Sequence, residues 1–80
     1  MVDSQTHKQV RVTDDALAGP YIRVSEGQLS RVRSLLEANG VAHWVDHHVV
    51  SVDGKPAMGV VNLRKGSDVS RIQTLLDSAA

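Results

Sequence analysis

The chain has 80 residues, of which 41% are hydrophobic, and this length fits one domain with a small core. It contains no cysteine, which excludes disulfides, thiolate metal sites and a cysteine nucleophile, so oligomerisation is the remaining common way to stabilise it. Nine basic and nine acidic side chains cancel, and the net charge therefore favours neither nucleic acid nor a membrane as a partner. The first residues lack the apolar segment of a signal peptide, so we expect a cytoplasmic protein without a cofactor.

The N-terminal quarter is expected to hold a tail and two short strands. Residues 1–6 are polar and predict a disordered tail, which leaves residues 7–80 as the domain. Alternation of Val10 and Val12 with polar residues predicts a strand over residues 7–13. A second strand is expected over residues 20–24, and the segment between the two strands fits either one helical turn or an ordinary loop.

Two segments forty positions apart, residues 29–38 and 69–78, share one helical pattern. The Ser25–Gln28 pair has the form of a capping box, which predicts that the first helix begins at Glu26. The second helix is expected to follow Ser67 or Asp68 as its N-cap. Apolar residues at three- and four-residue spacing predict the buried stripes of the two helices: Leu29, Val32, Leu35 and Leu36, and Val69, Ile72, Leu75, Leu76 and Ala79.

The segment 41–52 is strand-like but too long and too irregular for one straight strand. Its apolar residues change from odd to even positions, so we expect a bend or a bulge near residues 46–48, where one extra residue would exchange the two faces. The Asp53-Gly54 pair predicts a hairpin turn over residues 53–56, and a return strand should follow over residues 57–64.

The order of elements is therefore β, β, α, β, β, α, which predicts an α+β fold. Each helix has one apolar stripe, so both helices should cover the same face of an antiparallel sheet. This is a variant of the ferredoxin-like plait, written β-(βαββα), that lacks the last strand. Either the strand near Val10 or a second chain could fill the empty place.

Four segments carry a resemblance to a known family. They are Leu-Leu-Glu-Ala-Asn-Gly-Val at residues 35–41, Ala-His-Trp-Val-Asp at 42–46, Gly-Val-Val-Asn-Leu at 59–63 and Leu-Leu-Asp at 75–77. Together they resemble the small bacterial "putative signal-transducing protein" family, which is related in fold to the PII nitrogen regulators. The tight turn at residues 53–56 departs from that family's longer connection. The resemblance implies a regulatory or adaptor role and transfers no ligand site.

One cluster of side chains could bind a metal ion: His43, Asp46 and His48. Asp46 and His48 lie two positions apart, about 6.6 Å along a strand, and could converge on zinc or nickel with a third ligand such as His7. Solvated polar residues on an edge strand explain the same pattern, and a pH-sensitive contact is the better functional use of these histidines.

A second candidate site is a phosphate cradle before the second helix, formed by Arg64, Lys65, Gly66 and Ser67. An ordinary turn and helix cap accounts for the same residues, because the earlier glycine of a P-loop is missing. No serine lies in a nucleophile elbow, so we expect no enzymatic activity.

Trp44 is the remaining candidate, as one of only two aromatic residues in the chain. It either anchors an interface on the uncovered side of the sheet or caps the small core. With Val10 and Val12 at a possible edge strand, it suggests a non-enzymatic regulatory or adaptor module that forms a homodimer and binds a protein partner. A small-molecule or metal sensor that uses residues 43–48 is the other hypothesis.

Overall fold

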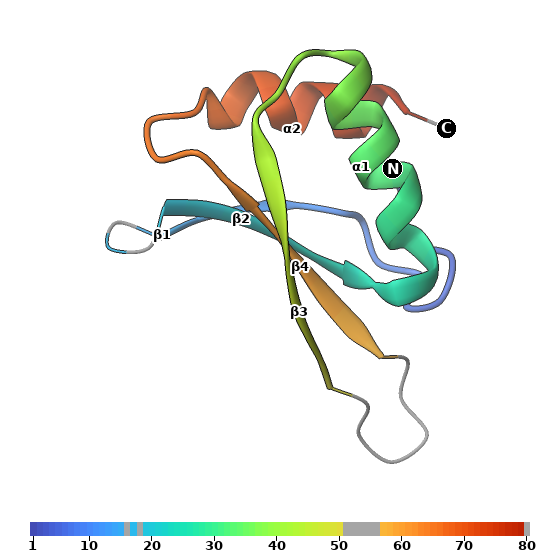
Figure 1. Ribbon diagram of the computed structural model, residues 1–80. Helices are drawn as coiled ribbons and strands as arrows, with labels where there is room; N and C mark the ends of the chain where they lie inside the picture. The colour runs from blue at the N-terminus through green and yellow to red at the C-terminus, as the bar shows by residue number, and fades with distance from the viewer. Residues whose placement is uncertain (16, 18, 51–56, 80) are drawn as a thin grey trace.

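A four-stranded antiparallel sheet carries two helices on one face in the computed structural model, which describes residues 1–15, 17, 19–50 and 57–79 (Figure 1). The strands lie in the order β1-β2-β4-β3. The α+β class and the antiparallel sheet are thus confirmed. The elements in chain order are β1 (Val12–Asp15), β2 (Gly19–Ser25), α1 (Glu26–Ala38), β3 (His43–Val50), β4 (Met58–Leu63) and α2 (Val69–Ser78).

The first strand lies at the sheet edge beside β2, in the place that the sequence left open. Its register pairs Val12 with Ile22 and Asp15 with Gly19, so that β1 and β2 are antiparallel neighbours. Gly19 has a φ of 87°, a conformation that glycine adopts without the steric cost of a side chain. The strand expected over residues 7–13 therefore begins later, at Val12, and ends later, at Asp15.

Residues 1–6 pack against the domain, whereas the sequence predicted a disordered tail. Met1 is only 7% exposed, and its ammonium group donates to the carbonyl of Leu76 in α2. Val2 forms a bridge with Gln9, and Asp3 is buried as well. The prediction from polar composition is wrong, because Asp3 and Gln5 use their polar atoms to bond to Ser25 and Gly27 at the start of α1.

The core lies between the helices and the sheet and consists of aliphatic side chains. The repeated pattern places equivalent residues inside, Val32 and Leu36 in α1 and Ile72 and Leu76 in α2. Buried partners come from the central strands and from the N-terminal segment: Ile22, Val24, Val61, Leu63, Met1 and Val10. The predicted stripe of α1 is confirmed, since Leu29 and Leu35 pack against this core, and that of α2 is confirmed for Ile72, Leu76 and Ala79.

The start of α1 is where the sequence predicted, but the capping box is wrong. Ser25 makes no side-chain bond to the helix; its hydroxyl donates to Asp3 Oδ1 at 2.6 Å. Gln28 is 0% exposed, and its Nε2 has no hydrogen-bond partner within the described chain. Instead Gln5 caps the helix from outside, because its Oε1 accepts from the backbone N–H of Gly27 at 3.2 Å.

The bend in the third strand is confirmed, although its size differs from the prediction. Asp46 pairs with Val60 and Val50 pairs with Met58, so three residues of β3 lie opposite one residue of β4. The irregularity therefore contains two extra residues rather than one. The turn predicted at residues 53–56 lies outside the described residues.

Candidate functional site

One face of the sheet has no helix on it, as Figure 1 shows. Side chains alternate along a strand, so the neighbours of the buried Ile22, Val61 and Leu63 point to this uncovered side. We call this surface the open face and define it by Thr13, Tyr21, Arg23, Trp44, Asp46, Met58, Val60 and Asn62.

The register of the strands arranges the open face in two rows. In the first row Thr13 lies beside Tyr21, Tyr21 beside Asn62, and Asn62 beside Trp44. In the second row Val60 has Arg23 on one side and Asp46 on the other. Neighbouring strands are about 4.8 Å apart, so the residues on β2 and β3 in each row, Tyr21 and Trp44 or Arg23 and Asp46, stand about 10 Å from one another.

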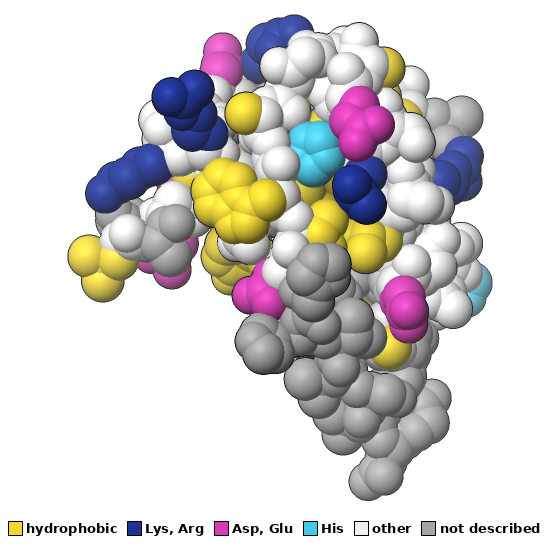
Figure 2. Space-filling view, in the orientation of Figure 1, with side chains coloured by type: hydrophobic (Ala, Val, Ile, Leu, Met, Phe, Trp, Pro, Cys, Tyr) yellow, Lys and Arg dark blue, Asp and Glu magenta, His cyan; other side chains and the backbone are white. Residues whose placement is uncertain are grey.

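Both aromatic residues of the chain lie in the first row, Tyr21 on β2 and Trp44 on β3. Trp44 is 55% exposed and Tyr21 is half-buried. Figure 2 shows hydrophobic side chains at the surface among basic and acidic ones on the side of the molecule where β3 lies in front. Of the two positions that the sequence allowed for Trp44, the structure thus shows the uncovered side of the sheet.

The structure separates the other two interface candidates from Trp44. Val10 is buried on the helical side of the sheet, where it contributes to the core. Val12 packs against the same core, and its backbone N–H donates to Gln73 Oε1 at 2.8 Å. These two valines therefore have a structural role beneath the helices, and Trp44 has neighbours from β2 and β4 instead.

The three proposed metal ligands do not form a group in the part of the structure that is described. His43 points to the helical side, where Nδ1 lies 2.8 Å from the carbonyl oxygen of Val41 and Nε2 lies 3.9 Å from Glu37 Oε1. Asp46 has the opposite parity and belongs to the open face. The side chain of His48 is outside the described atoms, and no cluster of three or more metal-ligating residues occurs among those that are described.

The four residues of the proposed phosphate cradle do lie together, in the turn between β4 and α2. Ser67 turns inward, because both its N–H and its hydroxyl donate to the carbonyl of Arg64. Gly66 has a φ of 88°, and Asp68 caps α2 by accepting from the N–H of Arg71 at 3.0 Å. A carboxylate already occupies this helix N-terminus, so the geometry favours the ordinary turn and cap over an anion site.

Tyr21 and Val60 are members of the open face that the sequence reasoning did not select. The alternation of side chains along a strand could have selected them. Tyr21 is next to the apolar Ile22 in a predicted strand and so lies on the other face, and Val60 has the same parity as Met58. What was missing is the pairing of β2 with β4, which sets these residues in rows with Trp44.

Comparisons of the chain with models of known protein families, with curated proteins and with solved structures found no match. Among the described residues, no helix has both the length and the apolar character that a membrane crossing requires.

Proposed function

We propose that this chain is a non-enzymatic interaction module that forms a homodimer through its open face. The observation that carries the proposal is the placement of the only two aromatic residues, Tyr21 and Trp44, in one row of the uncovered surface. Tyrosine and tryptophan are enriched in protein interfaces and supply a large share of their binding energy. The core, by contrast, is built without any aromatic side chain in the described residues.

The arrangement of the two rows supports a second copy of the chain as the occupant. A two-fold axis that runs along β4 between two stacked sheets places the β2 side of one copy over the β3 side of the other. Tyr21 then faces Trp44 of the second copy, and Arg23 faces Asp46 of the second copy. Val60 lies on the axis and meets its own equivalent. The open face is thus complementary to itself in both aromatic and charged groups.

Mass in solution tests the proposal. The wild-type chain should sediment or scatter light as a dimer in the micromolar range, and Trp44→Ala should weaken the dimer by about 2 kcal/mol, which is roughly 30-fold in dissociation constant. Leu17→Ala is the matched control, since Leu17 is 91% exposed in the β1–β2 connection and off the open face. A wild-type chain that stays monomeric at high concentration, or a Trp44→Ala dimer of unchanged affinity, would overturn the proposal.

A charge exchange tests the orientation of the dimer. Arg23→Asp and Asp46→Arg should each weaken association, because each places like charges opposite one another across the axis. The double variant should recover most of the lost affinity, since it restores opposite charges in exchanged places. Additive losses in the double variant would reject this axis.

The wider proposal is a regulatory or adaptor protein with a ferredoxin-like plait and a protein partner. The sheet order β1-β2-β4-β3, with β1 beside β2, supports the plait. The family resemblance, the cytoplasmic location and the partner stay predictions from the sequence.

A further inference from the structure

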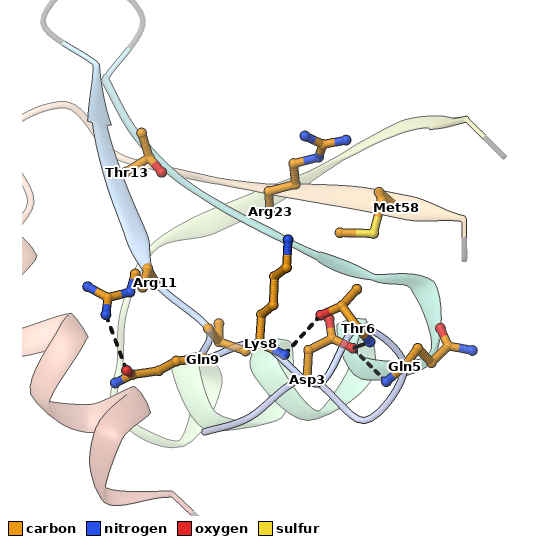
Figure 3. A pocket seen from close by; sticks show the side chains of 10 residues that line it. Asp3, Gln5, Thr6, Lys8, Gln9, Arg11, Thr13, Arg23 and Met58 are labelled. Atoms are coloured by element: carbon orange, nitrogen blue, oxygen red, sulfur yellow. Dashed lines mark hydrogen bonds between the residues drawn. The ribbon is translucent and has the colours of Figure 1, made fainter. Parts of the chain in front are cut away.

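A cavity of about 570 Å³ lies between the N-terminal segment and the end of the sheet (Figure 3). It exists because β1 pairs with β2 only from Val12 onward. Upstream of Val12 the chain leaves the sheet, and the space beside Arg23 and Met58 stays open. Its volume falls within the 300–1,000 Å³ range that is typical of small-molecule pockets.

Hydrogen bonds hold the N-terminal wall of this cavity in place. Asp3 accepts from both the backbone N–H and the hydroxyl of Ser25, at 2.7 and 2.6 Å. The backbone also closes on itself, since the N–H of Asp3 donates to the carbonyl of Lys8 at 2.8 Å. His7 has a φ of 59°, the only positive value at a described residue other than glycine, and this turn immediately precedes Lys8. The wall is therefore a defined structure that presents Lys8.

Basic side chains dominate the lining. Lys8, Arg11 and Arg23 face the cavity, and Asp3 is the only acidic residue among them. Figure 3 shows Lys8 extending from the N-terminal segment toward the strand that carries Arg23, whereas Arg11 turns toward Gln9. Neither Lys8 nor Arg23 has an acidic partner within 4 Å in the described part of the chain.

The acidic residue is already engaged. Burial raises the pKa of Asp3, but hydrogen bonds from the Ser25 hydroxyl and from the N–H groups of Ser25, Gln5 and Thr6 together hold it below its ordinary value. Its carboxylate is therefore ionised and surrounded by donors of the protein itself. Because Arg11 turns toward Gln9, Lys8 and Arg23 are the two basic groups that remain to meet an anion in the cavity.

We propose that this cavity binds a small phosphate monoester. A phosphate group carries close to two negative charges at neutral pH, and its oxygens accept from both lysine and arginine, so it can bond to Lys8 and Arg23 together. Thr6 and Thr13 add hydroxyl donors at the rim. Met58, which is half-buried, offers apolar surface for the organic part of the ester. The site lies apart from the turn at residues 64–67 that the sequence suggested for phosphate.

Calorimetric titration at pH 7.5 and low salt tests the proposal with two probes, inorganic phosphate and phenyl phosphate. Phenyl phosphate should bind with one site per chain and more tightly than inorganic phosphate, because only the ester has an apolar group that can contact Met58. Lys8→Gln should weaken phenyl phosphate binding about tenfold, the loss of one charged hydrogen bond. Arg23→Gln should weaken it too, but this variant also removes the contact proposed with Asp46 of the second copy, so Lys8→Gln is the variant that decides. Arg33→Gln is the matched control on the exposed side of α1, and Lys65→Gln tests the other candidate site.

The outcomes separate the two proposals of this protein. Unchanged binding in Trp44→Ala, with loss in Lys8→Gln, supports the cavity whatever the oligomeric state is. No saturable binding of phenyl phosphate would overturn the proposal, and so would an equal loss in Arg33→Gln or a loss confined to Lys65→Gln. Because Lys8 is exposed, its variant should keep the wild-type thermal unfolding, which shows that any loss is local.

Discussion

Replacement of Asp3 by alanine should destabilise the whole domain, although the residue lies in a segment that reads as a tail. Its carboxylate accepts from the N–H and hydroxyl of Ser25, and Ser25 is fully buried. Asp3→Ala leaves these two donors without a partner, at about 1–3 kcal/mol each, or about 2–6 kcal/mol together. A domain of this length has a total stability of about 4–12 kcal/mol, so the loss is a large fraction of it.

Urea unfolding followed by circular dichroism measures this loss directly. Asp14→Ala is the control, because Asp14 is an exposed carboxylate on neighbouring β1 and should change stability by less than about 0.5 kcal/mol. A double-mutant cycle with Ser25→Ala isolates the pair, and the two changes should be strongly non-additive. Asp3→Ala with wild-type stability, or an additive cycle, would refute the inference that this segment is anchored through Ser25.

Two further predictions concern the same end of α1. Folding lowers the pKa of Asp3 from 3.8, so its carboxylate adds stability at all pH values above the unfolded pKa. This contribution should disappear as the pH falls through the folded pKa. Urea midpoints measured between about pH 5 and 2 should therefore fall less steeply in Asp3→Ala than in wild type. Gln28→Met should raise stability by about 1 kcal/mol and the melting temperature by about 4–8 °C. The reason is that it removes a buried amide nitrogen that has no hydrogen-bond partner within the described chain. A lower melting temperature would show that this nitrogen does have a hydrogen-bond partner.

The sequence was sufficient for the helices and for the core residues that they contribute, because both depend on local periodicity. Val32 and Leu36 recur as Ile72 and Leu76, and each pair is buried as the spacing predicts. The irregularity near Asp46 was predicted from a change of parity along the strand, although the two extra residues that the structure shows do not exchange the faces as one extra residue would. These features need no knowledge of which distant segments meet.

The N-terminal segment could not be predicted, because its order depends on contacts across the chain. Polar residues at a chain end usually stay in water, yet Asp3 meets Ser25 and Gln5 meets Gly27, 22 positions away in each case. The same contacts explain why the predicted capping box between Ser25 and Gln28 does not form. Ser25 has the right residue type and position for a cap, but its hydroxyl donates to a carboxylate that local reasoning could not place beside it.

The candidate sites also contain some features that the local sequence pattern predicts and others that depend on contacts between distant segments. Exposure of Trp44 followed from the parity of β3 once Val41 and Val45 were known to pack on the core. Its row with Tyr21 depends on the register of β2 against β4, which no pattern within either strand specifies. The metal hypothesis depended on Asp46 and His48, and the opposite parity of His43 and Asp46 is confirmed by the sheet, which turns His43 to the helical side.

The N-terminal eleven residues join stability to the phosphate site proposed above. Met1 and Val10 complete the core, Asp3 and Gln5 bond to the start of α1, and the chain between them presents Lys8 to the cavity. These separate roles explain why a cavity lined by basic residues also contains the acidic residue Asp3. The negative charge of Asp3 is taken up by the donors that anchor the segment, and the anchoring in turn holds Lys8 in front of β2. Any change that releases Asp3 therefore removes the wall of the cavity together with the stability that the segment contributes.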